Sequence, residues 1–158
     1  MEKKSREDEM SYFTYIASDY PLPKVERPDC EVAIEFSTET GSVFDGDYED
    51  DFALYPAEGL SDVRTEKKYA VYLEWNYYTE GRAKNIIAYI KENLKYTDEV
   101  EIWRIWAGAG EIFNVHTKNI PIASLCPEMI RELDEQEIKI ETVEGYESVD
   151  QYRYVVRR

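Results

Sequence analysis

Five carboxylate side chains lie within seven residues of one another in this chain, at Asp45, Asp47, Glu49, Asp50 and Asp51. Hard cations such as Ca²⁺ bind several carboxylate oxygens at close range, so this spacing can build a metal loop. An EF-hand loop that starts at Asp45 needs glycine at its sixth position and glutamate at its twelfth, but Asp50 and Pro56 stand there. The spacing therefore favours a solvated acidic loop over a metal site, and these five residues are the candidate partner-binding residues. We assign no metal ligands, and calcium stays as the alternative.

These carboxylates belong to the part of the chain where the charge is concentrated. Residues 30–62, here called the acidic segment, contain ten acidic residues and no lysine or arginine. Residues 1–29 and 63–158 have net charges of only -2 and -3, so two thirds of the total of -15 comes from this segment. A localised negative potential repels nucleic acid and anionic membranes and attracts basic proteins. We therefore expect a basic protein as partner, and neither direct nucleic-acid binding nor a membrane surface.

Common catalytic patterns are absent from the sequence. It contains no glycine loop with lysine for phosphates, no His-Glu-x-x-His and no Cys-x-x-Cys. His116 is the only histidine, and Cys126 stands before Pro127, where a helix N-terminus can lower the pKa of a thiol. Cys126 and His116 could form a catalytic pair, but a structural or surface histidine and a capping or packed cysteine are favoured. We predict no catalytic residue and no cofactor, and the chain more closely fits a protein that is not an enzyme.

Three tryptophans, Trp75, Trp103 and Trp106, are the residues from which a ligand pocket could be built. Indole rings stack on apolar faces and attract cations. Core packing is the more common use of tryptophan, so this pocket belongs to the alternative hypothesis. In that hypothesis the chain is a small ligand-binding domain or enzyme with an aromatic and acidic pocket for a cationic or sugar ligand.

Two helices are predicted from the spacing of apolar residues. Residues 79–96 give the clearer one, with Thr79 as its cap. Its apolar positions recur at the 3.6-residue period of one helix face: Ala83, Ile86, Ile87, Ile90 and Leu94. A shorter helix is expected to begin near Pro127, with Ile130 and Leu133 directed inward.

Strands are predicted at residues 12–17, 31–37, 69–77, 100–106, 112–117, 137–143 and 151–156, with a short one near 52–55. The strand at 100–106 carries large side chains on both faces. Val100, Ile102 and Trp106 share one face, and Trp103 and Ile105 share the other. This pattern favours a central strand that is covered on both sides.

The predicted fold class is α+β with two helices. From residue 69 to residue 143 the element order is that of a ferredoxin-like βαββαβ unit, with a hairpin that turns at residues 108–110. The N-terminal strands would extend this sheet or form a second one, and a C-terminal strand would follow. We expect residues 10–158 to form a single domain after a flexible charged tail at residues 1–9.

Three stretches carry a resemblance to known proteins: Ser11-Tyr-Phe-Thr-Tyr-Ile-Ala-Ser-Asp19, Tyr72-Leu-Glu-Trp75 and Glu101-Ile-Trp-Arg-Ile-Trp106. Through them the chain from Met10 onward resembles a group of small bacterial proteins of uncharacterised function. The resemblance implies no activity, so it assigns no functional residue.

The remaining expectations concern location and function. The N-terminus alternates charged residues where a signal peptide is apolar, and the two cysteines, Cys30 and Cys126, are too few for a disulfide framework. We expect a cytoplasmic protein with reduced thiols, and the sequence assigns no oligomeric state. The leading hypothesis is a non-enzymatic binding protein that presents an acidic surface to a basic protein, as immunity proteins, inhibitors and nucleic-acid mimics do.

Overall fold

A computed structural model of the chain describes residues 12–26, 34–37, 42–45, 52–57, 65–75, 77–106, 112–136 and 140–158. Its strands are β1 (Tyr12–Ser18), β2 (Ile34–Ser37), β3 (Ser42–Asp45), β4 (Ala53–Pro56), β5 (Tyr69–Glu74), β6 (Glu99–Trp106), β7 (Ile112–Pro121), β8 (Ile140–Val143) and β9 (Tyr146–Arg157). Its helices are α3 (Glu80–Asn93) and α4 (Pro127–Asp134), with a short 3-10 helix, η1 (Ile122–Ser124), before α4. The predicted tail at residues 1–9 lies outside the described residues.

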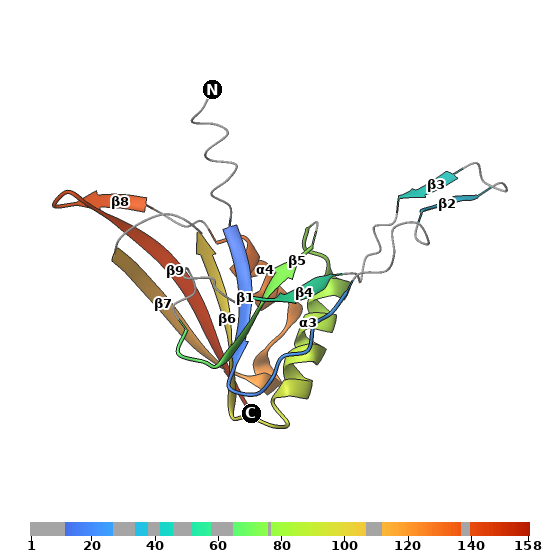
Figure 1. Ribbon diagram of the computed structural model, residues 1–158, viewed down its shortest axis with the longest axis horizontal. Coiled ribbons are helices and arrows are strands. Elements are labelled where there is room, and N and C mark those ends of the chain that lie inside the picture. The colour runs from blue at the N-terminus through green and yellow to red at the C-terminus, as the bar shows by residue number, and fades with distance from the viewer. Residues whose placement is uncertain are drawn as a thin grey trace.

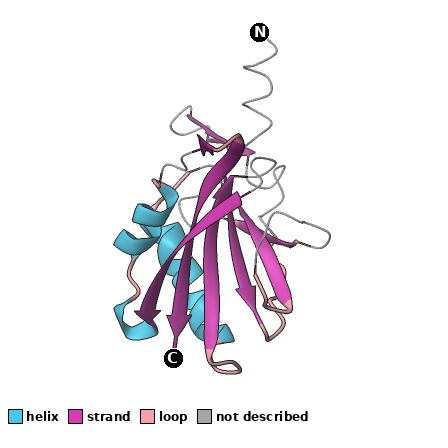
Figure 2. Cartoon of the chain, turned by 90° about the vertical axis from the view of Figure 1, so that its left-hand side faces the viewer, coloured by secondary structure: helices cyan, strands magenta, loops and turns pink. Residues whose placement is uncertain are grey.

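One mixed sheet forms the body of the molecule. Six strands follow the order β4-β5-β1-β6-β9-β7, and β8 adds a seventh by pairing with β9. The pairing of β7 with β9 is parallel and the other pairings are antiparallel. Both helices lie on one side of this sheet (Figure 2), which we call the helix face. We refer to the sheet and its two helices together as the body.

A second, two-stranded sheet is formed by β2 and β3. It lies apart from the larger sheet (Figure 1). The sequence allowed the N-terminal strands either to extend the main sheet or to form another. The structure shows both outcomes, because β1 and β4 join the main sheet and β2 and β3 do not.

Helix α3 forms as its sequence predicts. The side chain of Thr79 accepts a hydrogen bond from the backbone N–H of Arg82 at 3.1 Å, which satisfies one of the free donors of the first turn. The five apolar residues of the predicted stripe are all buried: Ala83, Ile86, Ile87, Ile90 and Leu94. They pack with Ile130 and Leu133 of α4 and with Ile16, Leu73 and Ile102 of the sheet in one core.

The sheet face opposite the helices has a smaller core of its own. Tyr15, Trp103 and Ile105 are buried there, and Phe13 and Tyr72 pack against them. Strand β6 therefore buries side chains on both faces between β1 and β9. The prediction of a central strand at residues 100–106 is confirmed.

The α+β class and the two helices are confirmed, but the ferredoxin-like strand order is not. β1 lies between β5 and β6, and β9 lies between β6 and β7, so the predicted hairpin does not pair β6 with β7. The exposure of β7 and the burial of β9 explain why β9, and not β7, pairs with β6. Residues 114–119 of β7 are all exposed, as suits an edge strand, whereas β9 buries Val149 and Val155 on one face and Tyr154 and Val156 on the other.

A tight turn sets β8 beside β9. Val143 pairs with Tyr146, which leaves Glu144 and Gly145 as a two-residue loop. Both loop residues have positive φ, at 51° and 85°. Two positive φ angles in succession match the right-handed twist of a hairpin, and glycine reaches this conformation without steric cost. The C-terminal strand thus begins earlier than the sequence pattern predicted.

Candidate functional site

The acidic residues singled out from the sequence begin where β3 ends. Asp45 is the last residue of β3 and pairs with Ile34 of β2. Asp47, Glu49, Asp50 and Asp51 lie outside the described residues. The backbone of the β2–β3 sheet therefore leads directly into the most acidic part of the chain.

In the body, in contrast, many basic side chains are paired with acidic side chains of the body. Ion pairs join Lys24 to Glu26, Lys67 to Asp19 and Glu99, Lys84 to Glu80, Lys95 to Glu92, Arg131 to Glu135, Arg153 to Glu101, Arg157 to Glu99 and Arg158 to Asp98. All of these acids lie outside residues 30–62. Exposed pairs add little to stability, but each cancels charge locally. Most of the excess negative charge, ten of fifteen, lies in the acidic segment, where no lysine or arginine is available to pair with it.

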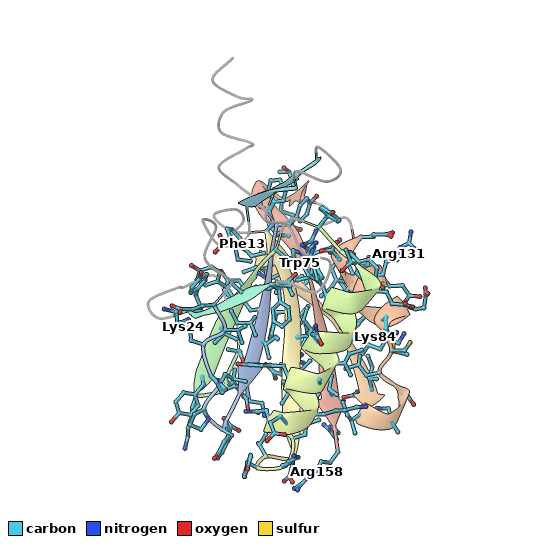
Figure 3. All side chains as sticks on the ribbon, turned by 90° about the vertical axis from the view of Figure 1, so that its right-hand side faces the viewer. Phe13, Lys24, Trp75, Lys84, Arg131 and Arg158 are labelled. Atoms are coloured by element: carbon cyan, nitrogen blue, oxygen red, sulfur yellow. The ribbon has the colours of Figure 1, made fainter. Side chains whose placement is uncertain are left out.

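The three tryptophans do not share one site. The ring of Trp75 contacts Tyr78 and the helix-face core, and Trp106 lies on the same sheet face as Ile102. Figure 3 shows Trp75 and Arg131 toward one end of the molecule and Arg158 toward the other. Trp103 is buried on the opposite face, where its Nε1 donates a hydrogen bond to Glu101 at 2.8 Å. Trp75 and Trp106 can therefore contribute to a site on the helix face, and Trp103 cannot.

Polar side chains cross four neighbouring strands on the helix face. His116 of β7 pairs with Tyr152 of β9, Tyr152 with Arg104 of β6, and Arg104 with Thr14 of β1. Paired residues in a sheet point to the same face, so these four side chains form one row. On each strand this polar row lies two residues away from the apolar row that contains Ile16, Ile102 and Tyr154.

Arg104 is the centre of this row. Its guanidinium carbon lies 4.6 Å from the ring centroid of Tyr12, and Nη1 lies 3.6 Å from Oδ1 of Asp134, the last residue of α4. Tyr12 also meets Trp106 edge to face, with the ring centroids 4.6 Å apart. We call Tyr12, Arg104, Trp106 and Asp134 the arginine cluster.

Burial perturbs the two charged members of the arginine cluster. It raises the pKa of the Asp134 carboxyl, against the opposing effect of Arg104, and it lowers the pKa of the Arg104 guanidinium, against Asp134. Both shifts have desolvation as their largest cause. A separation of 3.6 Å is too long for a hydrogen bond, so the pair offsets this cost only in part.

His116 lies at the exposed end of the polar row. Its Nε2 is 3.1 Å from Oδ1 of Asp150, and its ring stacks on Tyr152 with the centroids 5.0 Å apart. Cys126 is the N-cap of α4, makes no side-chain capping bond and is a free thiol. Among the described contacts His116 is paired with Asp150, and none joins it to Cys126.

The described part of the body contains a hollow under the helices and a groove at the other end. The hollow is narrow and mostly apolar, and Thr14, Trp75, Ile86, Ile130 and Asp134 are among its lining residues. The groove is more open and is lined by Lys91, Leu94, Lys95, Ile122, Ala123 and Arg158. Within the described ranges no three His, Cys, Asp or Glu residues are grouped to hold a metal, and no helix is long and apolar enough to cross a membrane.

Sequence reasoning missed the arginine cluster apart from Trp106. One signal was available. Arg104 stands between Ile102 and Trp106 on the face of β6 that a two-residue period assigns to the core. An arginine at such a position needs a partner, which is a reason to look for one. Nothing in the sequence indicated that Tyr12 and Asp134, which are far away in the chain, would lie beside it.

The comparisons with known proteins give no relative for this chain. No family model, no curated protein and no solved structure matches it.

Proposed function

We propose that this chain is a non-enzymatic binding protein whose acidic segment recognises a basic protein. The separation of charge within the molecule carries the proposal. Lysines and arginines of the body meet acids of the body, while residues 30–62 hold ten acids and no base. The negative charge is concentrated in the acidic segment, and the rest of the chain has a small net charge. Such a potential attracts a basic partner to the acidic segment and raises the rate at which the two proteins associate.

Proteins that neutralise a toxin, inhibit a nuclease or imitate nucleic acid would all use such a surface, because their targets carry positive patches for phosphate groups. We extend the proposal to this class of partner and to the cytoplasm as its location. The resemblance to small bacterial proteins is compatible with it and adds no function.

Binding to a panel of basic proteins, with neutral proteins of similar size as references, tests the proposal. The informative variant changes Asp47, Asp50 and Asp51 to Asn, which removes three charges and keeps the side-chain shapes. The matched control changes three exposed acids of the body, Glu66, Glu132 and Glu144, to Gln. Both variants have the same net charge, so they separate a local surface from a general effect of acidity.

The proposal predicts that the acidic-segment variant loses most of its binding and that the control keeps it. Salt should weaken binding by the wild type steeply, since the screening length falls from roughly 30 Å to 8 Å between about 10 and 150 mM salt. Equal losses in the two variants would show that only net charge matters. The acids would then serve solubility rather than recognition.

The alternative of a pocket for a cationic or sugar ligand keeps one supporting observation. Trp75 and Asp134 both line the narrow hollow under the helices. Titration of the protein with simple sugars and quaternary ammonium ions, followed by tryptophan fluorescence, tests it. A saturable change that Trp75→Phe removes would favour this alternative.

A further inference from the structure

Arg104 holds an almost buried positive charge, and one of its guanidinium donors, Nε, has no hydrogen-bond acceptor in the described part of the chain. Its side chain is only 12% exposed, and its Nε is buried without a partner. Asp134 is its one charged neighbour among the ion pairs of the described residues, at 3.6 Å, and Tyr12 offers the face of a ring instead of an acceptor. Leaving guanidinium donors unmatched in a desolvated site is costly.

A second unmatched donor lies in the same cluster. The indole Nε1 of Trp106 is buried and has no acceptor. Trp106 follows Arg104 by two residues, so the two side chains leave β6 on the same face. Both of them contact the ring of Tyr12. Nε of Arg104 and Nε1 of Trp106, two donors without acceptors among the described residues, therefore belong to side chains that both contact Tyr12.

We propose that the arginine cluster is a binding site for a small monoanionic carboxylate. The Nε edge of a guanidinium presents two parallel N–H groups that match the two oxygens of a carboxylate, and the indole N–H of Trp106 adds a third donor. The charge balance favours a monoanion. Arg104 is the single cation of the cluster and Asp134 is already beside it, so a doubly charged phosphate would be repelled.

The residues around the arginine cluster indicate what chemical group the carboxylate of the ligand is attached to. The narrow apolar hollow reaches the cluster through Asp134 and through Thr14, the register partner of Arg104. The hollow has a volume of only about 10 Å³, so an apolar group attached to the carboxylate would lie against its opening and not inside it. Tyr12 is 39% exposed and is the member of the cluster that can swing away to admit the ligand. The site is independent of the acidic segment and of the function proposed for it.

Nuclear magnetic resonance of the indole N–H groups tests this inference directly. The chain has three tryptophans, and single Trp→Phe variants assign their three signals. The wild type is titrated with sodium benzoate, and with inorganic phosphate as the comparison anion. Benzoate should shift the Trp106 signal in a saturable way. The Trp103 signal should stay in place, because that indole already donates to Glu101.

Two arginine variants complete the test, and each is first checked for a cooperative melting transition. Arg104→Lys keeps the charge but loses the paired donors, and it should weaken benzoate binding roughly tenfold or more. Arg157→Gln removes an exposed arginine elsewhere on the sheet and should bind like the wild type. The inference is overturned if benzoate does not shift Trp106, if phosphate shifts it equally, or if Arg104→Lys binds benzoate as tightly as Arg157→Gln does.

Discussion

Replacing Ile90 by Ala tests how α3 is held on the sheet. Ile90 is fully buried in the helix-face core, and the change deletes three carbon atoms from it. At about 0.8 kcal/mol for each buried methylene, the lost transfer free energy is about 2.4 kcal/mol. The cavity left behind raises the expected loss to about 3–4 kcal/mol, a large part of a total stability of about 5–15 kcal/mol.

Urea unfolding followed by circular dichroism measures this loss as a drop of about 1–2 M in the unfolding midpoint. Lys84→Ala is the control on the same helix, because the Lys84 side chain is 64% exposed, and it should change stability by about 0.5 kcal/mol or less. A loss below about 1 kcal/mol for Ile90→Ala would refute the packing described for α3. Ile87→Asp, which places a charge in the same core, should prevent folding.

Three further predictions concern polar groups. Glu101→Ala should destabilise the protein by about 2–4 kcal/mol, because the buried Trp103 indole loses its acceptor, and Glu101→Gln should restore much of this in the same urea assay. Partial burial raises the pKa of Tyr89, so its contribution to stability is complete below the unfolded pKa of about 10 and is lost as the pH rises above it. Tyr89→Phe should therefore flatten the fall in melting temperature above that pH, and an unchanged slope would contradict the shift. Cys126 is free, so thiol titration of denatured, unreduced protein should find both cysteines reactive, and a bridge between Cys30 and Cys126 would give none.

Local patterns in the sequence predicted the elements of the body well. The stripe of α3 and its cap at Thr79 are decided within a few turns of the chain, and the structure contains both. The alternation in β6 assigned Trp103 and Trp106 to opposite faces, as the structure has them. These features depend on spacing alone, which one sequence displays in full.

Strand order depends instead on contacts between distant segments. The glycines at residues 108–110 favoured a hairpin, but β9 competes for the same edge of β6 and can bury side chains on both faces. The exposed residues of β7 can only occupy an edge. A single sequence shows each of these preferences and does not rank them. The arginine cluster has the same origin, because it joins Tyr12, Arg104 and Asp134 from three separate elements.

The most direct test of the proposed function is the rate at which a basic protein partner associates, measured by stopped-flow fluorescence at several ionic strengths. The account predicts that the wild type and the Glu66, Glu132 and Glu144 control associate fast, with rates that fall steeply as salt rises. The variant with Asn at positions 47, 50 and 51 should associate slowly and respond weakly to salt. If this variant and the control share the same rate and the same salt dependence, the acidic segment is not the recognition surface.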